Sequence, residues 1–450
     1  MRKTVFLLIA AIALAAYVYF YEIKGGEKRE KAKEISEKLF NVEKDSINHI
    51  EIKSTAGNFI FNKNSDGWQI EQPVKTGADE SPINSLLSSI DNTKKSRTFS
   101  IKAGEKGQYG LGRSATLLKV TQTSGEMDSV LLGDKTSIGS NVYATMEDTA
   151  VYLVPQSIKT NASKSLFDWR NKKTILFKKD EVREFTLSSP HGKFTFEKDG
   201  SDWKITKPIE TKAERSAIDG VLNKLSFTNF KSVLSEEPSG LSKYGLSRPA
   251  YDIELFSGPE KAKTSVAFSK LDGNESNGKD AARPFIFTVD STFIKPFNKD
   301  LFGFRDKSII DFETGKATRI NLSNNNEVMT FMKDTSDTWY LSTGEKAKNY
   351  KINSLLSSIK NLKAEKFINE NPTYFMNYGL VNPESRIEVY EGDNLIAELN
   401  LGYKKDGFVY VYNPDRKPVV TIKEEKLKDL FPPKTDLLEE VKDNKESTEK

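Results

Sequence analysis

Apolar residues spaced like one face of an α-helix occur at three places along the chain. Within residues 83–90 they fall at i, i+3, i+4 and i+7, the spacing of one helical face. The first set is Ile83, Leu86, Leu87 and Ile90. The same eight letters return at 352–359, and the spacing recurs with other letters at 218–225. One amphipathic helix therefore repeats about every 135 residues, which predicts three copies of one unit.

Three other markers keep the same period as the helix. They are a tryptophan, the tripeptide Tyr-Gly-Leu, and a seven-residue motif that closes each of the first two units. Because all of them recur in phase, they predict a threefold tandem repeat. The markers are Trp68, Trp203 and Trp339; Tyr109–Leu111, Tyr244–Leu246 and Tyr378–Leu380; and 166–172 with 301–307.

Short runs that alternate apolar and polar residues predict β-strands around each helix. In the first unit, 49–54 and 58–63 predict a hairpin, and Trp68 begins a third strand. Ser81 is expected to cap the helix, with Pro82 in its first turn. Further strands are expected at 116–121, 129–132, 142–145 and 151–154, and a closing helix at 157–167.

The second and third units repeat this order, so the predicted fold class is α+β. Each unit is expected to hold a largely antiparallel sheet, one amphipathic helix and a short closing helix. The predicted domains are a transmembrane anchor at 1–23, a charged stalk at 24–44, units at 45–175, 176–310 and 311–435, and a disordered tail at 436–450.

The N-terminal segment is typical of a membrane anchor. Val5–Tyr21 is a run of 17 residues without a charge. This length is at the short end of what spans a bilayer. The alternative is a signal peptide cleaved near Ala13–Ala15, but the apolar run continues past that point. We therefore expect a single-pass inner-membrane protein with its body in the periplasm.

Composition excludes several kinds of chemistry. The chain has no cysteine, which rules out disulfides, thiolate catalysis and cysteine-ligated zinc. Its net charge of +4 comes from 68 basic and 64 acidic residues that are mixed along the chain, so no nucleic-acid partner is expected. Its two histidines, His49 and His191, have no equivalents in the other units, and neither predicts a catalytic triad or a metal site.

Three short motifs resemble known sites only in part. Ser357–Lys360 and Lys75–Gly77 match penicillin-binding motifs, but their order is reversed and they lie in different units. Asp272–Gly278 resembles a calcium loop without its required glycine and glutamate, and a hairpin insertion explains it better. We therefore predict no catalytic, cofactor-binding or metal-ligating residue, and no small-molecule cofactor.

The anchor, the W-x-I strands, the repeated helix and a Tyr-Gly-Leu that precedes Arg248-Pro249 or Asn382-Pro383 resemble the bacterial family called domain of unknown function 4340. The first unit departs from this pattern with Arg113-Ser114. The resemblance covers about residues 45–435 and implies an envelope protein that works beside gliding-motility-type ABC transport systems. It supplies no catalytic residues.

Three functions remain open at this point. The first is a non-enzymatic accessory or scaffold protein that binds ABC transporter subunits in the envelope. The second is an extracytoplasmic module that binds a glycan or a peptide in a cleft between units. The third is a hydrolase that uses carboxylates alone.

Overall fold

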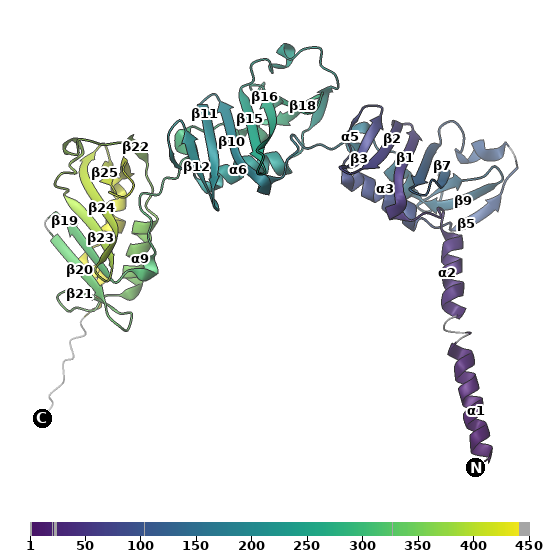
Figure 1. The fold of residues 1–450 in the computed structure, drawn as a ribbon, viewed down its shortest axis with the longest axis horizontal. Coiled ribbons are helices and arrows are strands. Elements are labelled where there is room, and N and C mark those ends of the chain that lie inside the picture. The colour runs from purple at the N-terminus through teal and green to yellow at the C-terminus, as the bar shows by residue number, and fades with distance from the viewer. Residues whose placement is uncertain (1, 20, 22–24, 103, 326, 441–450) are drawn as a thin grey trace. The chain divides into compact units, whose positions relative to one another are not determined.

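The computed structural model describes residues 2–19, 21, 25–102, 104–325 and 327–440 (Figure 1). Contacts group the chain into two compact units. The first comprises Met1–Arg183, Leu187–Pro190 and Leu222–Phe297, and the second comprises Glu184–Thr186, His191–Val221 and Asn298–Lys450.

Two helices precede the first repeat. Helix α1 (Arg2–Tyr17) has 16 residues and rises about 24 Å. Helix α2 (Gly25–Glu37) carries the alternating charges of the predicted stalk. The transmembrane helix expected over Val5–Tyr21 is not found. None of the helices in the described part of the chain is long and apolar enough to cross a membrane.

The first repeat forms a nine-stranded sheet in the order β4-β3-β2-β1-β6-β7-β8-β9-β5, with antiparallel pairs throughout. Its strands are β1 (Ile47–Ser54), β2 (Gly57–Asn64), β3 (Gly67–Gln72), β4 (Thr76–Gly77), β5 (Arg97–Ser100), β6 (Thr116–Gln122), β7 (Met127–Lys135), β8 (Asn141–Thr145) and β9 (Ala150–Pro155), and its helices are α3 (Glu80–Asn92), α4 (Gln156–Ala162) and α5 (Leu166–Trp169).

The second repeat follows the same strand order, β13-β12-β11-β10-β15-β16-β17-β18-β14, which confirms the prediction of one shared fold. Its strands are β10 (Val182–Ser189), β11 (Gly192–Asp199), β12 (Asp202–Lys207), β13 (Thr211–Lys212), β14 (Ser232–Ser235), β15 (Tyr251–Ser257), β16 (Ala262–Phe268), β17 (Glu275–Asp280) and β18 (Ile286–Asp290), and its helices are α6 (Arg215–Phe227), α7 (Ser291–Ile294) and α8 (Leu301–Phe304).

The third repeat has eight strands in the equivalent order β21-β20-β19-β23-β24-β25-β26-β22, and helix α9 lies beside this sheet (Figure 1). Its strands are β19 (Arg319–Asn324), β20 (Glu327–Lys333), β21 (Trp339–Leu341), β22 (Lys366–Asn369), β23 (Ser385–Glu391), β24 (Asn394–Lys405), β25 (Phe408–Tyr412) and β26 (Val419–Lys423), and its helices are α9 (Asn349–Lys360), α10 (Leu427–Leu430) and α11 (Lys434–Leu437).

The repeated apolar residues build the core of each repeat. Trp68, Trp203 and Trp339 are all buried, and so is the aliphatic residue two positions after each of them. The apolar faces of α3, α6 and α9 are buried as well, which confirms the helical spacing. The predicted stalk also supplies core residues to the first repeat, namely Leu39, Phe40 and Val42.

Two local predictions were wrong. Asp79, not Ser81, is the N-cap of α3, because the Asp79 side chain accepts a hydrogen bond from the Ser81 amide at 3.0 Å. The segment Asp272–Gly278 does lie in a hairpin, that of β16 and β17, but it is not an insertion, because β17 is a regular strand of the second sheet. Its polar sequence hides it, because a strand is recognised mainly by alternating apolar residues.

The C-terminal residues are partly ordered. Leu437 at the end of α11 is buried, and Leu438 pairs with Ala347. Residues 436–439 therefore belong to the third repeat, although they were expected in the disordered tail. Residues 441–450 of that predicted tail lie outside the described residues.

We predict that Leu355→Ala lowers the free energy of unfolding of the third repeat by about 2–5 kcal/mol, because it leaves a cavity under the buried face of α9. Hydrogen exchange of the repeat's strands measures this change. The neighbouring exposed residue gives the control, since Ser354→Ala is expected to change exchange little. Equal effects of the two changes would contradict the assigned helix face.

Candidate functional site: the junctions between repeats

The chain passes from the first repeat to the second through residues 170–173, here called junction 1, and from the second to the third through residues 305–308, called junction 2. In junction 1, Arg170 pairs with Ala78 of the first repeat, and Lys173 pairs with Asn229 of the second. Only two residues separate these pairings, so the connection between them is short.

Junction 2 repeats this backbone arrangement. Arg305 pairs with Ala213, and Ser308 pairs with Lys363. The amide of Asp306 also donates to the Lys212 carbonyl at 2.9 Å. In both junctions the outgoing segment, which begins at Arg170 or Arg305, pairs with the residue stretch just before the amphipathic helix of its own repeat. The incoming segment, which begins at Lys173 or Ser308, pairs with the residue stretch just after the amphipathic helix of the next repeat.

The two ends of the array use the same pairing positions with other residues. Lys38, which follows α2, pairs with Lys94 after the helix of the first repeat. At the other end, Leu438 takes the position of the two junction arginines. The stalk and the C-terminal segment therefore close the outer repeats.

Each junction buries an arginine side chain. In junction 1 the Arg170 side chain is 1% exposed, and its Nη2 donates to Glu236 Oε1 at 2.7 Å. Its guanidinium lies 5.1 Å from the centre of the Phe285 ring. Arg283 lies 5.0 Å from that ring and donates to the carbonyls of Lys173 and Thr174 at 2.6 and 2.8 Å. Two guanidinium groups thus share one aromatic ring.

The arginine of junction 2 makes more side-chain hydrogen bonds than the arginine of junction 1. Nη1 and Nη2 of Arg305 donate to the two carboxylate oxygens of Glu370 at 2.5 and 2.8 Å, and Nε donates to Thr211 at 3.1 Å. Its guanidinium lies 3.5 Å from the centre of the Phe367 ring. Such a bidentate pair with ring stacking is specific to arginine, because lysine cannot form both contacts at once.

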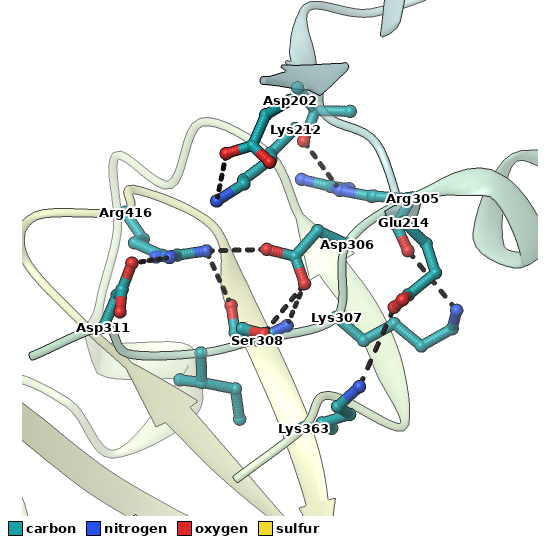
Figure 2. A network of polar contacts seen from close by, with 12 residues as sticks. Asp202, Lys212, Glu214, Arg305, Asp306, Lys307, Ser308, Asp311, Lys363 and Arg416 are labelled. Carbon is teal, nitrogen blue, oxygen red and sulfur yellow. Dashed lines mark hydrogen bonds and ion pairs between the residues drawn. The ribbon is translucent and has the colours of Figure 1, made fainter. Parts of the chain in front are cut away.

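A second charged group flanks Arg305 in Figure 2. The Asp306 carboxylate accepts from the amide and hydroxyl of Ser308 at 3.0 and 2.8 Å and from Arg416 Nη1 at 3.4 Å. Burial alone would raise the pKa of Asp306, but the Ser308 hydrogen bonds and Arg416 outweigh it and hold that pKa below its usual range. Arg416 also donates to the Ser308 carbonyl at 2.9 Å, as Arg283 does to the incoming segment of junction 1.

A cavity of about 640 Å³ lies in junction 2, within the second compact unit. Its walls include Arg305, Asp306, Phe367, Glu370 and Arg416. This volume lies in the range of small-molecule binding pockets.

The junction charges favour binding over proton transfer. A general acid needs a carboxyl group with a raised pKa, whereas the pKa of Asp306 is lowered. Glu370 is paired bidentately with Arg305 and offers no free base. Among the described residues, no cluster of three histidine, cysteine, aspartate or glutamate side chains could hold a metal ion.

The two histidines lie outside the junctions, whereas Gly77 of the Lys75–Gly77 motif accepts from the Asn171 amide of junction 1 at 2.8 Å. His49 Nδ1 lies 2.6 Å from Asn62 Oδ1 on the neighbouring strand, and His191 Nε2 lies 3.1 Å from Asn298 Oδ1. Ser357 donates to the Asn353 carbonyl within α9, as an ordinary helix residue does.

Sequence reasoning missed the residues that receive the incoming segments. The closing motif contains Arg170 and Arg305, but its match between units did not reveal a role for them. Their partners Glu236 and Glu370 stand two residues before a proline, 134 residues apart, and so keep the repeat period. That shared Glu-x-Pro spacing was the available signal.

The fold and its junctions define a class of tandem α+β repeat protein. The family model described as Domain of unknown function (DUF4340) matches residues 68–225, 203–349 and 339–440, so the chain belongs to this family. Each match begins at one of the repeated tryptophans, and the first two continue across a junction. No curated protein matches the chain.

We predict that Glu370→Gln destabilises the third repeat by leaving the Arg305 charge unpaired. Breaking a buried pair costs about 3–5 kcal/mol, and we expect about 2–3 kcal/mol because the Glu370 side chain is 40% exposed. Chemical denaturation followed by hydrogen exchange measures the loss. Glu345→Gln, at the more exposed ion pair with Lys434, is the control and should have little effect.

A second change tests the charge of Asp306. Because the folded state lowers the pKa of Asp306, the carboxylate contributes stability above the ordinary aspartate pKa of about 3.9. That contribution is lost as the pH falls through the lower pKa of the folded state. Asp306→Asn should therefore be less stable than the wild type at pH 7, and the two should converge in acid. A difference that is independent of pH would contradict this account.

Proposed function

We propose that this chain is a non-enzymatic, membrane-anchored protein of the cell envelope. It serves as an accessory or scaffold component of an ABC-type transport system, with its repeats on the periplasmic side of the inner membrane. The observation that carries the proposal is the pair of junctions, whose charged groups hold successive repeats together instead of standing free for catalysis.

The N-terminal helix supports the anchoring part of the proposal. Phe6, Leu7 and Leu14 on α1 are 76%, 69% and 68% exposed. Exposed apolar side chains in such a run are stabilised by contact with lipid or with another protein. The charged helix α2 follows, and Leu39 and Phe40, which come just after it, belong to the core of the first repeat.

A binding module for a glycan or a peptide is the second candidate, and the cavity of junction 2 favours it. A carboxylate-dependent hydrolase finds less support. Such an enzyme needs one carboxyl group kept protonated, and the two carboxylates beside Arg305 are both paired with arginines.

We predict that crosslinking in cells recovers transporter subunits together with the full chain from the membrane fraction. A matched variant without residues 2–21 should lose this recovery, because the anchor brings the repeats to the membrane. Mass spectrometry of the crosslinked products measures both results.

Two outcomes of this experiment count against the scaffold. One is recovery of the chain alone from the membrane fraction. The other is turnover of an envelope substrate that a single Asp or Glu change abolishes, which would support the hydrolase instead.

A further inference from the structure

The two junctions are built on equivalent strand positions, which allows a comparison residue by residue. Ser232 of β14 pairs with Thr288 of β18, and Lys366 of β22 pairs with Thr421 of β26. Counting from these pairs, the positions of Phe230, Phe285 and Phe287 in junction 1 correspond to those of Ala364, Pro418 and Val420 in junction 2.

Aromatic rings fill junction 1. The ring of Phe230 lies 5.6 Å from that of Phe285 and 5.0 Å from that of Phe287. Phe285 also receives the guanidinium groups of Arg170 and Arg283, at 5.1 and 5.0 Å. Each such contact is favourable, because the face of an aromatic ring attracts a cation.

Junction 2 lacks these three rings, and the three smaller residues that replace them all line the 640 Å³ cavity. Phe367, which stands where the second repeat has Val233, restores one ring and stacks on Arg305. The position of Phe285 itself is taken by Pro418, beside the walls formed by Arg305 and Arg416. The cavity thus corresponds to a place where the other junction holds an aromatic side chain.

We propose that the cavity of junction 2 binds an aromatic side chain from a partner polypeptide, in the place that Phe285 occupies in junction 1. The proposal rests on the proposed function as a scaffold and names one point of contact. An aromatic ring fits better than an aliphatic group, because the buried guanidinium of Arg305 and the partly buried one of Arg416 flank the space.

The rim of the cavity suits a polypeptide. Glu210, Asn371 and Lys417 line it and are exposed, so they can form hydrogen bonds with a peptide backbone. The lining charges are nearly balanced, with Lys212, Arg305, Arg416 and Lys417 against Glu210, Asp306 and Glu370. This balance gives no preference for a strongly charged ligand, whereas a peptide with one aromatic residue meets both the apolar and the polar surfaces.

The test uses the full chain and two probes, the pentapeptides Gly-Gly-Phe-Gly-Gly and Gly-Gly-Leu-Gly-Gly, in ligand-observed NMR titrations. We expect the phenylalanine peptide to bind at least tenfold more tightly than the leucine peptide. Pro418→Phe, which restores the ring of junction 1, should abolish this binding. Pro414→Phe, an exposed proline outside the cavity lining, is the matched control and should leave it unchanged.

A photoreactive version of the phenylalanine peptide gives a readout that does not depend on a variant. Its label should map to residues around Phe367 and Pro418. Absence of binding to the wild type, equal binding to the Pro418→Phe variant, or labelling elsewhere would each overturn the cavity proposal. If crosslinking in cells still recovers transporter subunits, the scaffold function stands and only this contact is wrong.

Discussion

An arginine side chain removed from water must keep a partner for its charge, and this constraint shapes both junctions. Arg170 and Arg305 are almost fully buried, so each requires a carboxylate on the repeat that receives it. Glu236 and Glu370 meet this requirement, and the aromatic rings beside them stabilise the planar guanidinium. Because the backbone pairs at each arginine and again three residues later, only a short connection separates the arginine from the next repeat.

Much of the fold could be predicted from apolar periodicity. The helix faces and the buried tryptophans follow directly from residue spacing. Strand β17 could not be found in this way, because its sequence Glu-Ser-Asn-Gly-Lys-Asp lacks alternating apolar residues. Strands β5, β14 and β22 have only four residues each, too few for a pattern. The cap of α3 was misplaced by two residues, because Asp79 and Ser81 are both good capping residues.

The junctions could be predicted less well, for a physical reason. An ion pair between residues 65 or 66 positions apart leaves no local periodicity, unlike a pair on one helix face. The repeat alone showed that Arg170 and Arg305 are equivalent, and the partners became visible only in three dimensions. The cavity depends on a further comparison, since it arises where the second junction lacks three rings of the first.

The ends of the array differ from its middle in a way that bears on how such a chain can lengthen. The first repeat has Ile101 and Asp148 where the second has Glu236 and Arg283, and the third repeat ends with Leu438 where the others have arginine. Only the second repeat has both Arg305, which is buried against the next repeat, and the residues Glu236 and Arg283, which surround the arginine of the preceding repeat. Gene duplication of the middle repeat would therefore yield a compatible fourth module, whereas a copy of either terminal repeat would interrupt the series.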